Sequence, residues 1–423
     1  MPVGHRALRD GGAPAWVWNE SDSRLAPVGP KKTVMAVRDP RPRRHPPTGC
    51  RSTLAALAAS LAIIGAVVSG SASAASVEPA VPSPYAGRVG VSSHLIWLSE
   101  SDAETALTPL VAGGVTWVRE DFPWDQLQPS PSQWDWTKSD NLMRAASRSG
   151  VNVLAILDYS APWASSDPSG GGDTHFPPSS VSAYAGYAGA VVARYGTNGS
   201  FWAANPGLEP RPLGAIEIWN EPFGWWNWKP APDPAAYAAL VRAAAAAARA
   251  AEPSIPVLAD GDLLEVRSDG AIVGWLDSLL SADPGLGSVV SAFAIHPYPD
   301  PPSKSPMETS GDPRWTYSGN VALVRQTEKL HAVRTPLWIT EIGWTTATGT
   351  SDGVTEAQQA QYVTQAVSLG IGMWGAFVQK VFVYSWDEST GAPRDAEGNY
   401  GLRRADGTFK PAWPSLAALI AGR

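Results

Sequence analysis

The sequence has 423 residues, of which 44% are hydrophobic and 17% are charged, with a single cysteine and a formal net charge of −7 at pH 7. One cysteine excludes a disulfide framework within the chain and a zinc site built from thiolates. A chain with more acidic than basic residues is a poor candidate for binding nucleic acid or anionic membrane surfaces, so we expect a neutral partner.

Residues 1–74 are predicted to be a leader with a secretory signal peptide. They contain ten Lys/Arg against four Asp/Glu, and an uncharged apolar run over residues 54–68 is followed by Ala72, Ser73 and Ala74. A basic stretch, a short apolar run and small residues before the cleavage point are typical of such a signal. We expect cleavage after residue 74 or 75 and a short linker over residues 75–86. A start at Met35 would give a leader of ordinary length.

A membrane anchor is the alternative interpretation of this apolar run, but the run is shorter than the ~20 residues that a spanning helix needs. Without the leader, 22 Lys/Arg remain against 35 Asp/Glu, a formal charge of −13, and no cysteine remains. We therefore expect a secreted, extracellular monomer with no stable membrane anchor and no nucleic-acid partner.

Eight apolar runs alternate with eight helical patterns over residues 87–423. The strands are predicted to end near Ser92, Glu120, Asp158, Trp219, Asp260, Ile295, Glu341 and Trp386. The helical patterns cover residues 103–111, 140–147, 181–194, 233–251, 272–281, 321–333, 355–373 and 413–420. Eight strand–helix units predict an α/β fold with one catalytic domain, a (β/α)8 TIM barrel. An open doubly wound sheet would need a glycine-rich loop after the first strand, where the chain has Ser92-Ser93-His94.

Two glutamates stand where predicted strands end. Glu221 follows the apolar run that ends in Trp219, and Glu341 lies between Trp338 and Trp344. Residues at the carboxyl ends of barrel strands form the active-site face. Two carboxylates on that face are what glycoside hydrolysis requires. A charge that only solvates a loop is the alternative interpretation of Glu221, and aromatic neighbours make it harder to explain Glu341 in that way.

Further polar residues at strand ends are candidates for supporting roles. Asn220 precedes Glu221 and can bind a sugar hydroxyl, and Arg119 is a candidate partner for Glu341, with a salt bridge to Glu120 or Asp121 as the alternative. His296 and Tyr298 leave the sixth strand two positions apart. For His296 a purely structural hydrogen bond is the alternative.

Aromatic residues are unusually frequent near these strand ends. Trp225 belongs to a group of three tryptophans just after Glu221, Trp344 lies after the seventh strand and Trp386 after the eighth. Flat aromatic faces beside carboxylates can stack on sugar rings, and packing of the core is the alternative. These residues complete the predicted substrate-binding set.

The combination of Trp219-Asn220-Glu221-Pro222 after the fourth strand with Thr340-Glu341 after the seventh resembles the retaining glycoside hydrolases of clan A. The resemblance extends over residues 87–423. It implies that Glu221 is the acid/base and Glu341 the nucleophile of a double displacement on β-linked oligo- or polysaccharides. It implies no cofactor and no metal.

Two families of that clan share further residues with this chain. The cellulase-type family 5 pattern is similar at Arg119, at the pair His296 and Tyr298, and at Trp386, but its histidine after the third strand is missing here. The segment over residues 159–165 and the early His94 are more similar to the xylosidase-type family 39.

Two other classes of function remain open at this point. One is a carbohydrate-binding protein on a catalytically inactive barrel. The other is a metal-dependent hydrolase that uses Asp158, Asp260 and His296, although the four histidines after the leader show no HxH or HxxxH spacing.

Overall fold

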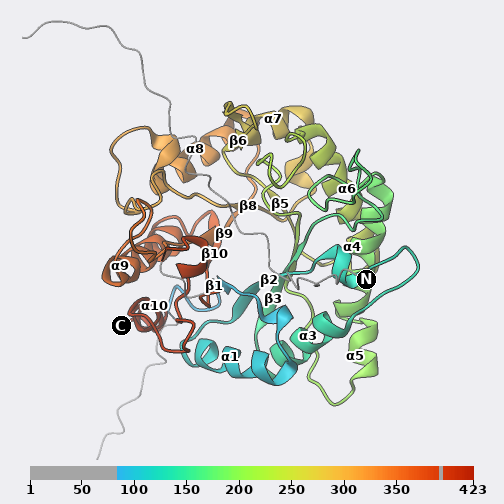
Figure 1. Cartoon of the computed structure of the whole chain (residues 1–423), viewed down its shortest axis with the longest axis horizontal. Helices are drawn as coiled ribbons and strands as arrows, with labels where there is room; N and C mark the ends of the chain where they lie inside the picture. The colour runs from blue at the N-terminus through green and yellow to red at the C-terminus, as the bar shows by residue number, and fades with distance from the viewer. Residues whose placement is uncertain (1–82, 390–393) are drawn as a thin grey trace, which may run out of the picture. The chain divides into compact units, whose positions relative to one another are not determined.

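The computed structural model describes residues 83–389 and 394–423, so the predicted leader lies outside the described residues. The described chain forms a closed barrel of eight parallel strands surrounded by helices (Figure 1), which confirms the predicted single barrel. Around the barrel the strands are β1 (Val89–Ser92), β2 (Trp117–Asp121), β3 (Asn152–Leu157), β4 (Ala215–Ile218), β5 (Val257–Asp260), β8 (Ala292–Ile295), β9 (Leu337–Ile342) and β10 (Val378–Val383). The first strand pairs in parallel with both β2 and β10, and this closes the barrel.

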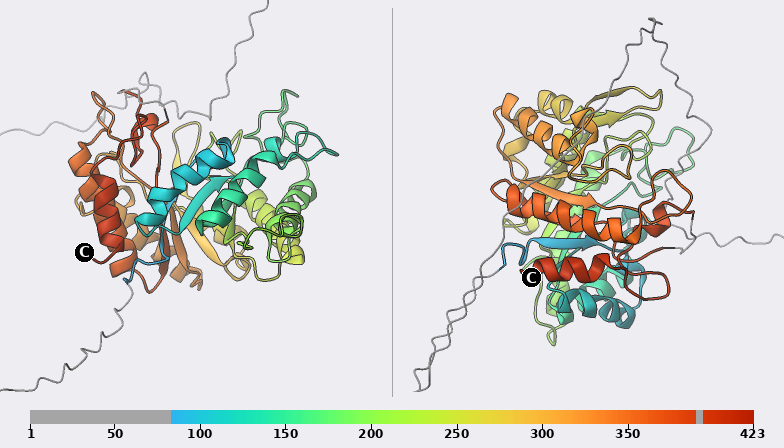
Figure 2. Two further views of the ribbon diagram at one scale, coloured as in Figure 1. Left: turned by 90° about the horizontal axis from the view of Figure 1, so that it is seen from below. Right: turned by 90° about the vertical axis from the view of Figure 1, so that its left-hand side faces the viewer.

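Helices form the outer layer, as the two side views in Figure 2 show. They are α1 (Glu100–Ala112), α2 (Trp124–Leu127), α3 (Thr137–Ser149), α4 (Val181–Tyr195), α5 (Ser200–Ala204), α6 (Pro234–Ala251), α7 (Trp275–Ala282), α8 (Tyr317–Leu330), α9 (Glu356–Val367) and α10 (Ala412–Ile420). None of these helices is both long and apolar enough to cross a bilayer.

Local sequence signals set the ends of the long helices. The side chain of Asp233 accepts hydrogen bonds from the amides of Ala235 and Ala236, and Pro234 takes the first turn of α6, where its missing N–H costs nothing. A run of alanines then continues this helix, as predicted. In α9, Thr355 and Gln358 form a reciprocal capping box.

One predicted helix begins later than expected. The pattern over residues 272–281 was expected to be helical throughout, but α7 begins at Trp275, and β7 (Ile272–Gly274) pairs antiparallel with β6 (Leu264–Val266) outside the barrel. A tight turn closes this hairpin, with Gly270 at φ 81°, a conformation that glycine adopts without strain. β-Branched Ile272 and Val273 favour the extended chain.

An apolar plug fills the barrel interior. It contains Trp117, Leu154, Leu258, Trp338 and Phe382, from five different strands. The rings of Trp117 and Trp338 meet edge to face with centroids 5.6 Å apart. Large aromatic side chains of this kind make the interior a packed core, so polar chemistry is restricted to the layer above it.

Candidate active site

A layer of buried polar side chains lies directly above the plug. Three of its members each come two positions after an apolar residue of the barrel interior on the same strand. They are Arg119 after Trp117 on β2, Glu217 after Ala215 on β4, and Thr340 after Trp338 on β9. Side chains two positions apart on a strand share a face, so all three extend into the barrel interior toward its carboxyl end.

Arg119 connects three residues of this layer. Its Nε and Nη2 donate to the two oxygens of Glu217, both at 2.9 Å, its Nη1 donates to Glu341 Oε2 at 3.0 Å, and its Nη2 also donates to Asn220 Oδ1 at 2.9 Å. The expected contact between Arg119 and Glu341 is confirmed. Burial alone would lower the pKa of Arg119, but the charges of Glu217 and Glu341 outweigh it and raise that pKa, so the guanidinium is a fixed cation.

The alternative pairing of Arg119 with Glu120 is wrong, because successive side chains on β2 point to opposite sides. The carboxylate of Glu120 accepts hydrogen bonds from the amides of Leu95 and Ile96, both at 3.2 Å, and from the hydroxyl of Ser93. Burial raises the pKa of Glu120 to about 8. This glutamate therefore anchors the loop after β1.

A bulge in β9 brings Glu341 into the site. Val381 pairs with Ile339 and Val383 with Ile342, so β9 has one more residue than β10 over this stretch. An extra residue changes the alternation of side chains locally, which allows Glu341 to reach the same interior as its neighbour Thr340. Tyr298 donates its hydroxyl to Glu341 Oε1 at 2.9 Å, and burial raises the pKa of this tyrosine well above its ordinary value, so it stays a neutral donor.

Glu221 is held in an unusual backbone turn after β4. Trp219 has φ 64° and Glu221 φ 47°, left-handed values that cost energy in residues other than glycine and that often occur at functional sites. The ring of Trp219 is buried and its Nε1 donates to the carbonyl of Asn227 at 2.8 Å. The indole thereby anchors the turn that aims Glu221.

His296 connects Glu221 with the polar layer. Its Nδ1 lies 2.8 Å from Glu221 Oε1 and its Nε2 lies 3.0 Å from Thr340 Oγ1. Burial alone would lower the pKa of His296, but the charge of Glu341 and the hydrogen bond to Glu221 outweigh it and raise that pKa to about 9. At neutral pH both ring nitrogens are therefore donors.

The raised pKa of His296 predicts a loss of stability in alkaline solution. The folded-state pKa of about 9 lies above the ordinary value of 6.5, so the stabilisation is complete below pH 6.5 and disappears as the pH rises through 9. We expect the free energy of unfolding of the wild type to fall between pH 6 and pH 10 by roughly 3 kcal/mol more than that of His296→Gln. Urea unfolding of both proteins measures this, and equal losses would contradict it.

Glu217 is expected to stabilise the site through Arg119. Replacing Glu217 by glutamine leaves a buried guanidinium without its two-point charged partner, so we expect a loss of about 3 kcal/mol of unfolding free energy. Glu356→Gln is the matched control, since Glu356 pairs with Arg404 on the surface and such pairs contribute less than about 1 kcal/mol. Urea unfolding compares the variants, and similar losses in both would refute the role of Glu217.

Sequence reasoning missed several residues of this site. Glu217 interrupts an apolar strand, and a buried charge there needs a partner, so that signal was present in the sequence. Glu397, at the start of a short 3-10 turn (Glu397–Asn399), accepts a hydrogen bond from Tyr384, and burial raises its pKa to about 7, with a smaller contribution from the charge of Glu341. No sequence pattern placed that loop near Glu341.

The aromatic candidates take different positions. Trp344 is 1% exposed and donates its Nε1 to the carbonyl of Lys304 at 2.9 Å, and Trp386 is fully buried against Phe409 and Trp413. A hydrogen bond thus holds Trp344 and ring packing holds Trp386, and stacking of either ring on a sugar stays a prediction. Trp225 is 39% exposed.

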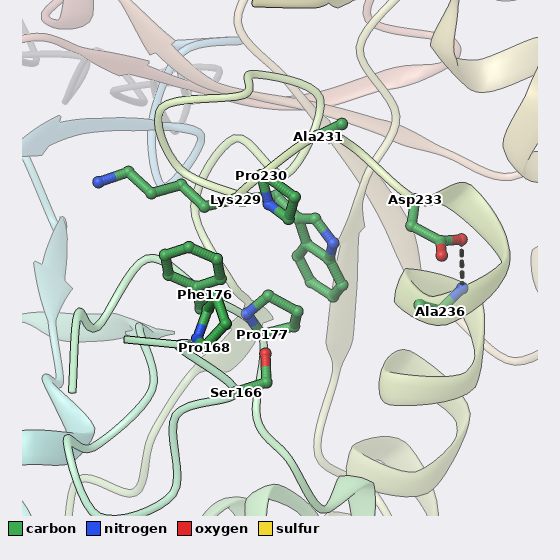
Figure 3. A pocket seen from close by; sticks show the side chains of 10 residues that line it. Ser166, Pro168, Phe176, Pro177, Lys229, Pro230, Ala231, Asp233 and Ala236 are labelled. Carbon is green, nitrogen blue, oxygen red and sulfur yellow. Dashed lines mark hydrogen bonds between the residues drawn. The ribbon is translucent and has the colours of Figure 1, made fainter. Parts of the chain in front are cut away.

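A groove of about 360 Å³ lies between the loops that follow β3 and β4 (Figure 3). Phe176, Pro177 and Pro230 form part of its apolar wall, and Lys229 lines it as well. The amide of Lys229 donates to the carbonyl of His175 at 2.9 Å. The ring of His175 lies 4.6 Å from that of Tyr159, whose hydroxyl accepts a hydrogen bond from Asn220 Nδ2. A continuous set of contacts thus leads from the groove to the carboxylates.

No protein-family model matches the sequence, and no curated protein matches it significantly. Solved structures do share the fold. A family 39 glycoside hydrolase from Bacteroides cellulosilyticus WH2 is 19% identical with a TM-score of 0.59 over 79% of this chain and 63% of that one. A monomeric beta-xylosidase from Caulobacter crescentus CB15 is 21% identical, with a TM-score of 0.56 over 79% and 68%.

The GH39 enzyme from Xanthomonas axonopodis pv. citri is also 21% identical, with a TM-score of 0.57 over 80% of this chain and 67% of that one. This chain therefore spans about two thirds of the length of these three proteins, and slightly less for the first. At identities this low, the three matches establish the shared barrel fold and nothing more.

Proposed function

We propose that this protein is a secreted, retaining β-glycoside hydrolase that cleaves O-glycosidic bonds by double displacement. The observation that carries the proposal is the spacing of the two glutamates. Oxygen atoms of Glu221 and Glu341 lie within 4.8 Å of each other and of His296 Nδ1 or Nε2. Retaining enzymes hold their carboxyl groups about 5 to 5.5 Å apart, whereas inverting enzymes need about 6.5 to 9.5 Å to admit a water molecule.

The contacts of each glutamate support a different role. Glu341 accepts hydrogen bonds from Arg119 and Tyr298, and these two donors hold its carboxyl group in place for attack on the anomeric carbon. Glu221 is bonded to His296, and this pair holds a proton that can pass to the leaving oxygen as the glycosidic bond breaks. In the second step Glu221 takes a proton from water, whose oxygen displaces Glu341 from the anomeric carbon.

The structural neighbours are consistent with this proposal. One is described as a beta-xylosidase, and another is an intracellular xylanase from Thermoanaerobacterium saccharolyticum whose E146A mutant was studied with xylotriose, 13% identical with a TM-score of 0.51. A β-xyloside is therefore the first substrate to test, followed by β-glucosides and β-mannosides.

Product stereochemistry tests the proposed function. The protein is incubated with aryl β-glycosides and with polysaccharides, and the anomer released first is followed by NMR. The β anomer is the expected first product, and initial release of the α anomer contradicts a retaining mechanism. No hydrolysis of any of these substrates would favour the inactive carbohydrate-binding barrel.

A metal-dependent hydrolase is the weaker alternative. Within the described residues, the ligand atoms that come together belong to Glu221, His296 and Glu341. Of the predicted metal ligands this set contains His296 but neither Asp158 nor Asp260. The fixed cation Arg119 lies 3.0 Å from Glu341 and would repel a metal ion there. Unchanged activity in EDTA is expected, and loss of activity with recovery on adding a divalent cation would favour the metal hydrolase.

A further inference from the structure

Two tryptophans differ from the others in their exposure. The chain has 20 tryptophans, and among those in the described residues Trp97 at 45% and Trp225 at 39% are the most exposed. Single exposed apolar residues are common on protein surfaces and need no explanation by themselves. Their common location is the informative observation, because both stand on loops that follow the carboxyl ends of barrel strands, on the same face as Glu221 and Glu341.

The ring of Trp97 is held in a fixed position. It ends the 3-10 turn Leu95–Trp97 after β1, and this turn is anchored where Glu120 accepts hydrogen bonds from two of its amides. Lys138 Nζ lies 4.1 Å from the centroid of the Trp97 ring and also donates to Gln126 Oε1 at 2.8 Å. A cation over an indole stabilises its orientation. The partly uncovered ring is therefore preorganised.

Trp225 is similarly fixed, four residues after Glu221. Its amide donates to the carbonyl of Val266 at 3.1 Å, so the loop is attached to the β6–β7 hairpin. Its ring meets that of Trp226 edge to face with centroids 6.3 Å apart. Gly224 allows this packing, because a Cβ there would lie 2.4 Å from the Trp226 ring. An exposed indole on an anchored loop is again a preorganised apolar face.

The two tryptophans lie on different sides of the barrel mouth. Trp97 follows β1 and Trp225 follows β4, three steps apart among the eight strands, with β2 and β3 between them. A straight path from one loop to the other therefore crosses the mouth, where Glu221 and Glu341 lie. The groove of Figure 3 is lined in part by Trp228, Lys229 and Pro230 of the loop that carries Trp225, which extends the apolar surface on that side.

We infer that Trp97 and Trp225 are stacking platforms for two separate sugar units of one polysaccharide chain, which crosses the barrel mouth over Glu221 and Glu341. The inference rests on the proposed function and specifies its substrate class. A chain held on both sides of the carboxylates is cleaved at internal bonds. An aryl glycoside of a single sugar reaches the carboxylates without contacting both platforms, so it gains less binding energy.

The test compares substrates of two lengths. For wild type, Trp97→Ala, Trp225→Ala and the control Leu330→Ala, kcat/KM is measured on xylohexaose and on an aryl β-xyloside, and likewise for the β-glucose series. Leu330 is 75% exposed and is the last residue of α8, just before β9 begins. It therefore lies at the end of the barrel opposite to the mouth. The ratio of hexasaccharide to monosaccharide kcat/KM is expected to fall about tenfold in each tryptophan variant.

Leu330→Ala should keep the wild-type ratio, and Trp97→Phe and Trp225→Phe should recover part of the loss because a phenyl ring still stacks. If both alanine variants kept the wild-type ratio of hexasaccharide to monosaccharide kcat/KM, the inference would be overturned. The proposed function would still stand in that case, because the substrates are hydrolysed. If the wild type hydrolyses none of these substrates, the proposed function fails, but the binding role of the two tryptophans can still be tested.

Native gels that contain xylan or soluble β-glucan measure this binding as retardation of the protein. Equal mobility of the wild type and both alanine variants would refute the stacking role of Trp97 and Trp225.

Discussion

Glu341→Ala is expected to reduce kcat on an aryl β-glycoside by about 10⁵-fold, because the variant lacks the group that attacks the anomeric carbon. The fold should persist, since Arg119 keeps its two-point contact with Glu217 when Glu341 is removed. Steady-state kinetics measure the loss of activity, and thermal unfolding verifies the fold. Near-normal turnover in this variant would remove Glu341 from the mechanism.

Leu330→Ala serves as the control for handling and folding, because Leu330 is exposed far from the polar layer. Glu341→Gln adds a second comparison. It preserves the shape of the side chain and its hydrogen bond from Tyr298, so an equally large loss would attribute the effect to the charge and nucleophilicity of the carboxylate rather than to a cavity.

Glu221→Ala is expected to lower kcat by about 10³-fold, and added azide is expected to restore about a hundredfold of that loss. An aryl leaving group departs without protonation, so the glycosyl enzyme still forms on Glu341, but no base then activates water. Azide needs no base, and it attacks the anomeric carbon and displaces Glu341. The product is a glycosyl azide of β configuration, identified by NMR.

The configuration of the azide product also distinguishes the roles of the two glutamates. In Glu341→Ala, azide can occupy the place of the missing carboxylate, and its product has the α configuration. If Glu221→Ala gave the α azide and Glu341→Ala the β azide, the two roles would be exchanged. If Glu221→Ala kept the wild-type rate and azide had no effect on it, Glu221 would not be the acid/base.

Much of the fold could be predicted because strand burial leaves a plain signal in the sequence. Parallel barrel strands are covered on both sides, so they appear as continuous apolar runs such as residues 153–157 and 292–295. The β6–β7 hairpin was missed because Ile272 and Val273 also fit the apolar spacing of the helix that follows them. Periodicity alone does not separate such short runs.

The candidate site was predictable only in part. Arg119, Tyr298 and Glu341 were identified from strand ends, and Glu341 accepts a hydrogen bond from each of the other two. The pairing of His296 with Glu221 was not expected, although both residues had been singled out. Which of several polar residues contact each other depends on side-chain direction and on loop conformation, and neither can be inferred from spacing along the chain.

By itself, the sequence determined that the chain has eight apolar strands and that polar residues lie at or just after many of their carboxyl ends, because burial and alternation act within each segment. Only the tertiary structure decided how those residues combine. The bulge in β9 turns Glu341 inward, the left-handed turn aims Glu221, and Arg119 finds its two-point partner in Glu217, 98 positions along the chain. Such contacts join different strands, so they exist only when the barrel closes and brings its strand ends to one mouth.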